Sequence, residues 1–170
     1  MKIKDSIALV TGANRGIGRS LVDALLNMGA KKIYATARDI ATLDELKAAE
    51  GERIVAVRLD VTKPEMINAA AKKAADVTLL INNAGVAMFA GLISAGDIKA
   101  ARAEMEVNYF GTLNMIRAFA PVLAANGGGG VVNLASIASY VNFPALGSYS
   151  ASKAAVHSLT QAVRAELAAQ

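Results

Sequence analysis

The sequence contains no cysteine, no tryptophan and a single histidine, His157, among its 170 residues. Without cysteine, the chain can form no disulfide scaffold, thiolate metal site or cysteine nucleophile. Carboxylates alone rarely make a zinc site, so we expect no bound metal. A serine hydrolase would have to use His157, and it is a weak alternative because no Gly-x-Ser-x-Gly elbow precedes a predicted helix.

Long apolar runs are also missing. No stretch approaches the ~20 apolar residues of a membrane-spanning helix, and residues 1–10 lack the long apolar core of a signal peptide. We therefore expect a cytoplasmic protein with no membrane partner. The formal charge is +4, the lysines and arginines are scattered, and aromatic residues are few. A nucleic-acid partner is therefore not expected either.

The composition is typical of one folded domain. Hydrophobic residues make up 54% of the chain and charged residues 19%, which is the reverse of a disordered sequence. The length leaves room for a single domain over residues 1–170.

Short apolar runs alternate with longer helical patterns. The runs predict strands at residues 7–10, 32–37, 54–59, 77–81 and 131–134. The helical patterns predict helices at residues 17–28, 40–50, 64–75, about 95–125, and from 149 to the end. Largely apolar strands are typical of sheets covered on both faces. The alternation therefore predicts a doubly wound α/β fold of the Rossmann type, with a parallel sheet.

The end of the chain is unusual for such a fold. Apolar residues at helical spacing continue from Ala154 to Leu167, and no capping residue follows before Gln170. The strand at 131–134 would lie near a sheet edge, and proteins usually cover apolar edges. We expect that the domain is incomplete at its C-terminus or relies on a partner.

A glycine-rich loop connects the first strand to the first helix. Residues 11–18 read Thr-Gly-Ala-Asn-Arg-Gly-Ile-Gly. In such loops the glycines permit the turn, the approach of a pyrophosphate and close helix–strand packing, while the helix N-terminus offers free N–H groups. No Gly-Lys-Ser/Thr follows, which disfavours an ATP-type loop. The predicted dinucleotide contacts here are Gly12, Asn14, Arg15, Gly16, Ile17 and Gly18.

The end of the second strand indicates which dinucleotide is bound. An NAD site has an acidic residue there for the ribose 2′-hydroxyl. This chain has Ala37 at that position and Arg38 directly after it, and an arginine attracts a 2′-phosphate. With Arg15 as a second cation, we predict NADP(H). The alternative is that Arg38 is an ordinary surface arginine and Asp39 reaches the ribose.

Tyr149 and Lys153 are four residues apart on a predicted helix, so their side chains share a face. A nearby ammonium favours the phenolate form of a tyrosine, which makes the phenol a usable acid and base. Ser136 follows the fifth strand, where its hydroxyl could bond a developing oxyanion. Ser139 is a neighbour that could be mistaken for it, and both serines could simply be turn residues.

Together these residues resemble the short-chain dehydrogenase/reductase family, in its NADP-preferring form. The resemblance extends from Lys4 to Gln170. It is carried by the loop at 11–18, Asp60-Val61, Asn82-Asn83-Ala84-Gly85, Asn108, Ser136 and Tyr149-x-x-x-Lys153. It implies hydride transfer between NADP(H) and a small-molecule carbonyl or alcohol, and a homo-oligomer, a dimer or tetramer. The strand order expected for the part present is 3-2-1-4-5.

The resemblance also implies a role for each catalytic residue. Tyr149 resembles the general acid and base. Lys153 resembles the residue that activates this phenol and holds the nicotinamide ribose. Ser136 resembles the group that polarises the carbonyl, and Asn108 the residue that kinks the long helix and holds a relay water.

Further cofactor contacts follow from the same resemblance. Asp60 and Val61 resemble adenine contacts, and the segment containing Asn83, Ala84 and Gly85 resembles the one that supports the sheet beside the cofactor. Asn108, Asn82 and Asn83 could instead be ordinary helix and turn residues. Family members usually continue into two more strands and a substrate loop. A nucleotide-binding or assembly module without turnover therefore stays an alternative.

Overall fold

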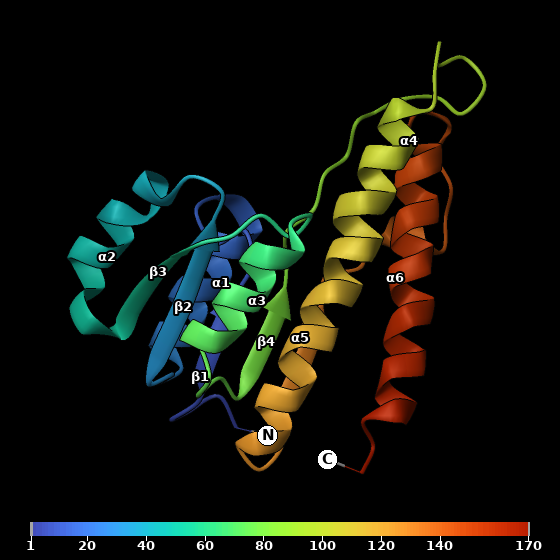
Figure 1. The fold of residues 1–170 in the computed structure, drawn as a ribbon. Coiled ribbons are helices and arrows are strands. Elements are labelled where there is room, and N and C mark those ends of the chain that lie inside the picture. The colour runs from blue at the N-terminus through green and yellow to red at the C-terminus, as the bar shows by residue number, and fades with distance from the viewer. Residues whose placement is uncertain (1, 170) are drawn as a thin grey trace.

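The computed structural model describes residues 2–169. Its centre is one five-stranded parallel sheet with the order β3-β2-β1-β4-β5 (Figure 1). This confirms the predicted fold class and strand order. The strands are β1 (Ile7–Val10), β2 (Lys32–Ala37), β3 (Ile54–Arg58), β4 (Leu79–Asn82) and β5 (Gly130–Asn133). The last two lie one or two residues from their predicted positions.

Helices cover both faces of this sheet. The α-helices are α1 (Gly16–Asn27), α2 (Asp44–Glu50), α3 (Pro64–Lys73), α4 (Lys99–Glu104), α5 (Thr112–Ala125) and α6 (Gly147–Glu166). Short 3-10 turns are η1 (Ile40–Leu43), η2 (Gly51–Arg53), η4 (Ile137–Ser139) and η5 (Pro144–Leu146), and η3 (Met105–Gly111) is a π-helix.

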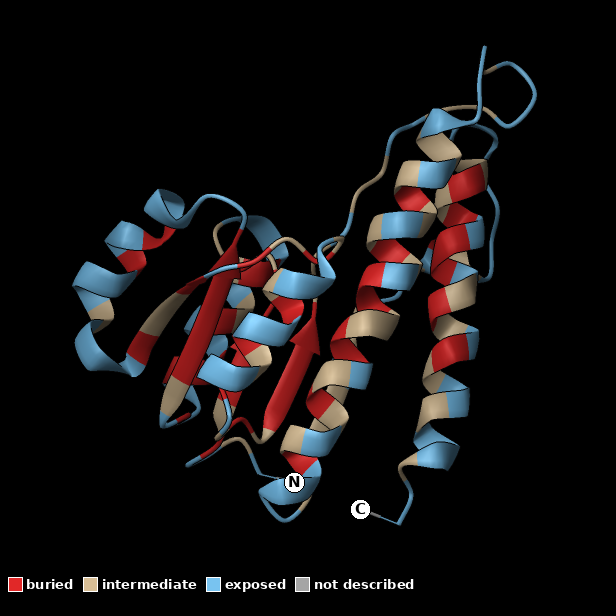
Figure 2. Ribbon diagram, viewed as in Figure 1, coloured by how far each residue is buried: buried red, intermediate tan, exposed pale blue. Residues whose placement is uncertain are grey.

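Two hydrophobic cores lie on opposite faces of the sheet. On one face, Val22 and Leu26 of α1 and Leu46 of α2 pack against alternate strand residues. On the other face, Phe119 of α5 and Leu159 of α6 contribute to the second core, together with residues of α3. Figure 2 shows the strands buried between helices whose outer faces are exposed. Burial on both faces explains why the strands read as apolar runs.

The long helix predicted at about 95–125 begins at Lys99 and consists of α4, η3 and α5 in succession (Figure 1). The predicted start at 95 was wrong. Residues 92–98 form turns and bends, and Asp97 Oδ1 accepts a hydrogen bond from Lys99 N at 2.8 Å. Pro121 lies inside α5 and does not end it.

Strand β5 forms an edge of the sheet within residues 2–169. Val132, at the middle of this edge, is 44% exposed. On α6, Val156 and Leu159 are buried, whereas Ala154 at the start of the predicted apolar face is exposed. Within residues 2–169, no helix combines the length and apolarity needed to cross a membrane.

Candidate active site

The glycine loop leaves the N-terminus of α1 open. The helix begins at Gly16, and its N-cap residue, Arg15, is extended and gives no side-chain cap. The first turn contains no acidic side chain, so its free N–H groups and the helix dipole favour an anion. Gly16 has φ +55°, and a Cβ added to it would meet nothing within 4 Å.

Gly18 serves a different purpose in the same loop. A Cβ at this position would lie 2.1 Å from Gly12 O and 2.5 Å from Asn83 Nδ2. The contact is possible only because glycine has no side chain, so α1 packs directly against the loop. Asn14 is half-buried beside this turn, while Ile17 is 66% exposed at its mouth.

The segment after β4 is tied to this loop. Asn83 Nδ2 donates hydrogen bonds to Thr11 O at 2.8 Å and to Gly12 O at 3.1 Å. Thr11 Oγ1 accepts from the backbone N–H groups of Asn83 and Ala84, both at 2.9 Å. Asn83 is therefore no ordinary turn residue, because it fixes the loop relative to the neighbouring strand.

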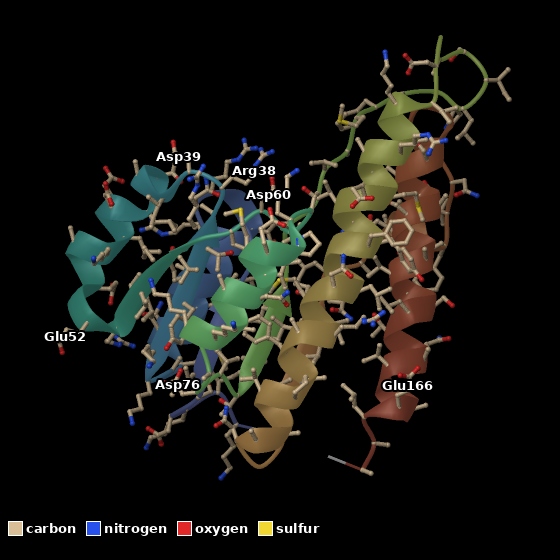
Figure 3. The ribbon with its side chains drawn as sticks, viewed as in Figure 1. Arg38, Asp39, Glu52, Asp60, Asp76 and Glu166 are labelled. Carbon is tan, nitrogen blue, oxygen red and sulfur yellow. The ribbon has the colours of Figure 1, made fainter. Side chains whose placement is uncertain are left out.

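Several charged residues of the predicted cofactor site gather at the carboxyl ends of β2 and β3. Figure 3 shows Arg38, Asp39 and Asp60 together there, with Asp76 at the opposite end of the sheet. Strand β2 ends at the buried Ala37, and the next residue, Arg38, is exposed. Asp39 Oδ1 accepts a hydrogen bond from Ala41 N at 3.1 Å and caps η1. This contact uses one carboxylate oxygen, so the choice between Arg38 and Asp39 at the ribose stays a prediction.

Asp60 is held as a carboxylate in this region. Partial burial raises its pKa, but hydrogen bonds from Thr62 and the positive charges of Arg38 and Lys63 outweigh this, so the net pKa lies below the ordinary value. The two hydrogen bonds, from Thr62 N and Thr62 Oγ1, measure 2.9 and 2.8 Å. Val61 is buried, and its Cγ2 would lie 2.8 Å from a Cβ added to Gly111. The adenine contacts of Asp60 and Val61 stay predictions.

Lys153 and Tyr149 lie side by side on α6, as their spacing predicts. Lys153 Nζ is 5.9 Å from the centroid of the Tyr149 ring. It donates a hydrogen bond to Leu134 O at 2.7 Å, just beyond β5. Lys153 is only 6% exposed, and this burial lowers its pKa because the charged form is desolvated.

Gly85 lies beside both the Asn108 side chain and the Lys153 ammonium. A Cβ on Gly85 would lie 3.1 Å from Asn108 Oδ1 and 3.5 Å from Lys153 Nζ. Asn108 is buried in the π-helix η3, and π-helical turns are frequent at functional sites. Its Oδ1 accepts from Val86 N at 2.8 Å, and its Nδ2 donates to Val86 O and to Ser152 Oγ, each at 2.9 Å. The relay water stays a prediction.

Ser136 precedes the turn η4, which packs against α6. Its Oγ accepts a hydrogen bond from Ala138 N at 3.1 Å, so its hydroxyl hydrogen is free to point elsewhere. Ser139 Oγ accepts from Ser136 N at 3.3 Å, which completes a reciprocal cap. His157 contacts the Tyr140 hydroxyl at 3.0 Å on the surface of α6 and η4.

Several residues in this network were not found from the sequence. Thr11 opens the glycine loop, but nothing in the pattern indicated that its hydroxyl binds the segment after β4. Asn82 Nδ2 donates to Asn133 Oδ1, and Asn133 Nδ2 donates to Thr160 Oγ1, both at 2.9 Å, joining β4, β5 and α6. Of these residues, Asn82 was named from the sequence, whereas Asn133 and Thr160 were missed, as were Glu104, Ser148 and Ser152.

A comparison with known families shows to which family the chain belongs. Residues 6–170 match the family model for short chain dehydrogenases. The chain belongs to the short chain dehydrogenase family. Short chain dehydrogenases are oxidoreductases that bind a nicotinamide cofactor, so the chain is assigned to an enzyme family of that kind.

Two solved short chain dehydrogenases are similar over nearly the whole chain. One, from Burkholderia cenocepacia J2315 in complex with NADP, is 50% identical with a TM-score of 0.93, over 99% of this chain and 69% of that one. Another, from Burkholderia phymatum in complex with NAD, is 33% identical with a TM-score of 0.88, over 98% and 61%. A galactitol 2-dehydrogenase (L-tagatose-forming) from Cereibacter sphaeroides is 41% identical over 98% of this chain and 67% of its own length.

The residues present fit a nicotinamide dinucleotide. The open N-terminus of α1 and the free space beside Gly16 suit a pyrophosphate. Gly85 brings the backbone close to Asn108 Oδ1, where an added Cβ would be crowded at 3.1 Å, and the same Cβ would contact Lys153 Nζ at 3.5 Å. The residues predicted to hold the cofactor are the loop at 11–18, Arg38, Asp60, Gly85 and Lys153.

Proposed function

We propose that the protein transfers a hydride between NADP(H) and a small-molecule carbonyl or alcohol. The observation that carries this proposal is the buried Lys153 ammonium beside the Tyr149 phenol. The same ammonium lies next to Gly85, in the segment that Asn83 ties to the glycine loop. Acid–base chemistry and dinucleotide binding are thus coupled through a short chain of contacts.

When bound, the nicotinamide supplies or accepts the hydride. The Tyr149 phenol gives its proton to the carbonyl oxygen during reduction and takes it back during oxidation. The Lys153 ammonium stabilises the negative charge that develops on the phenol oxygen as the proton leaves. The Ser136 hydroxyl donates a hydrogen bond to the same carbonyl oxygen, because its hydrogen is not used in the contact with Ala138 N.

The preference for NADP(H) is supported by the end of β2. Ala37 offers no carboxylate to repel a 2′-phosphate, and the exposed Arg38 follows it. Arg15 is exposed at the N-cap of α1 and supplies a second cation in this proposal. The Burkholderia cenocepacia relative was solved with NADP, whereas the Burkholderia phymatum relative was solved with NAD.

The proposal is tested by Tyr149→Phe, assayed with NADPH and a panel of ketones by nicotinamide absorbance. Loss of the phenol oxygen is expected to lower kcat by about 10²- to 10⁴-fold, the usual contribution of a general acid. The dissociation constant for NADPH should change by less than about 2-fold, since one hydroxyl is removed from a site that the glycine loop dominates. Tyr140→Phe is the matched control, because Tyr140 is an exposed tyrosine on the neighbouring segment.

Activity that survives Tyr149→Phe would contradict the role of this phenol. A wild-type protein that binds NADPH but exchanges no hydride with any ketone or alcohol would favour the nucleotide-binding or assembly module instead. The homo-oligomer implied by the family stays a prediction, and sedimentation of the protein measures it directly.

A further inference from the structure

Glu104 is a buried carboxylate with no part in the chemistry described so far. It lies at the end of α4 and is only 1% exposed. No lysine, arginine or histidine side chain in residues 2–169 forms an ion pair with it. A carboxylate in such a place is costly unless hydrogen bonds satisfy it. Its position therefore needs a structural reason.

Both carboxylate oxygens of Glu104 accept hydrogen bonds from separate segments. Oε1 accepts from Met88 N at 2.7 Å, in the loop that follows β4. Oε2 accepts from Ser148 Oγ, in the first turn of α6. One side chain of the long helix thus joins the loop after β4 to the start of the helix that carries Tyr149.

Asn108 repeats this arrangement four residues later. It binds Val86 N and O in the same loop, and Ser152 Oγ on α6. Glu104 and Asn108 are four residues apart, as are Ser148 and Ser152, which places each pair along one side of its helix. The two sets of hydrogen bonds form what we call the Glu104–Asn108 bridge.

The bridge ends beside the two residues proposed to carry the chemistry. Ser148 immediately precedes Tyr149, and Ser152 immediately precedes Lys153. Lys153 has a second anchor in its hydrogen bond to Leu134 O. Tyr149 lies in the first turn of α6, whose N-cap residue Leu146 gives no side-chain cap. Uncapped helix ends fray, so the first turn depends on contacts such as the one from Glu104.

We infer that Glu104 is a positioning residue, which fixes the first turn of α6 and thereby the direction of the Tyr149 phenol. Asn108 likewise fixes the next turn of α6, which carries Lys153, through its hydrogen bond to Ser152 Oγ. This inference rests on the proposed function, because it assigns to Glu104 an effect on the reaction that Tyr149 performs. Glu104 itself touches neither cofactor nor substrate in this scheme.

The kinetic test compares Glu104→Ala with Glu104→Gln. Alanine removes both hydrogen bonds, and we expect kcat to fall by about 10- to 100-fold, since a displacement near 1 Å can cost 10²-fold. Glutamine keeps an oxygen for Met88 N and an amide that can donate to Ser148 Oγ, so it should restore most of kcat. Glu106→Ala is the matched control, because Glu106 is an exposed glutamate two residues away.

Binding of 2′,5′-ADP separates positioning from general damage to the fold. This probe has no nicotinamide and is expected to contact only the glycine loop, the end of β2, and Asp60 and Val61 after β3. Its dissociation constant should stay within about 2-fold of wild type in Glu104→Ala. Equal losses of kcat and of 2′,5′-ADP affinity would overturn the inference, as would an unchanged kcat. Should Glu104→Ala fail to fold, Ser148→Ala removes only the α6 side of the contact and should lower kcat alone.

A spectroscopic readout works whether or not the protein proves to be an oxidoreductase. In protein labelled with ¹³C in its tyrosine rings, Tyr149→Phe assigns the Tyr149 signal. That signal should shift or broaden in Glu104→Ala and in Ser148→Ala, and keep its wild-type position in Glu104→Gln and Glu106→Ala. A Tyr149 signal that stays unmoved in Glu104→Ala refutes the positioning role. A wild-type protein without activity refutes the proposed function. In that case the Tyr149 signal alone decides whether Glu104 positions Tyr149.

Discussion

Replacing Gly16 by alanine should weaken dinucleotide binding far more than the accompanying loss of folding stability explains. Gly16 has φ +55°, a region that costs an ordinary residue about 1–2 kcal/mol. For a chain of this size, that loss corresponds to a fall in Tm of about 2–8 °C. The added methyl group would meet no protein atom within 4 Å, so it points into open space at the N-terminus of α1.

That open space is where the proposed function places the pyrophosphate. A methyl group there keeps the phosphate away from the first N–H groups of α1. A hydrogen bond to a charged group is worth about 1.5–3 kcal/mol, and each 1.4 kcal/mol corresponds to a tenfold change in affinity. Loss of one such bond therefore predicts a dissociation constant for NADPH about 10- to 100-fold higher than that of wild type.

Gly51→Ala is the matched control for this measurement. Gly51 ends α2, has φ +58° and ψ −130°, and has equally open surroundings. This backbone region is essentially restricted to glycine and costs another residue about 1–3 kcal/mol. Gly51 lies just before β3, at the end of the sheet away from the glycine loop. Gly51→Ala should therefore destabilise the protein at least as much and leave NADPH affinity unchanged.

Calorimetric titration with NADPH and thermal unfolding of the unliganded protein measure the two quantities separately. Two results would contradict this prediction: Gly16→Ala binds NADPH as wild type does, or Gly51→Ala loses the same affinity. The first result would remove the pyrophosphate from the N-terminus of α1. The second would mean that affinity merely follows stability.

Two further predictions concern charged residues. Burial lowers the pKa of Lys153, whereas a lysine in an unfolded chain has a pKa of about 10.4. Between these two values the unfolded state binds more protons than the folded state. The free energy of unfolding therefore rises with pH over this interval. Lys153→Met should remove this rise in urea unfolding at alkaline pH, and an unchanged slope, or the same loss in the surface variant Lys73→Met, would contradict it. Arg38→Ala should raise the dissociation constant for NADPH by about 10- to 100-fold, the value of one charge-assisted hydrogen bond, and leave that for NADH within about 2-fold. The exposed Arg102→Ala is its control, and equal effects on both cofactors in a calorimetric titration would show that Arg38 does not recognise the 2′-phosphate.

The sequence was informative where local chemistry determines structure. The glycine loop, the strand order, and the Tyr149–Lys153 pair depend on spacings of a few residues or on a recognisable combination of motifs. In each case the physical reason operates locally: a turn that needs glycine, or two side chains one helical turn apart. The position of Arg38 after β2 followed from the end of an apolar run in the same way.

Contacts between distant segments could not be predicted. Glu104 is a glutamate in a helical pattern, and such residues are usually solvated. It becomes buried only because the loop carrying Met88 and the first turn of α6 both meet it. Thr11 and Asn133 likewise acquire their roles from neighbouring strands. No pattern along the chain records which strand or helix will face such a side chain.

The π-helix η3 also restricts which insertions and deletions the long helix can accept. Its hydrogen bonds span five residues instead of four, so the helix before it and the helix after it do not continue the same angular register. Removing one residue from 105–111 would let this segment return to ordinary α-helical hydrogen bonds. The π turn that carries Asn108 would then be lost, and with it the position from which Asn108 reaches Val86 and Ser152. A deletion at this point would therefore act first on the hydrogen bonds beside Tyr149 and Lys153.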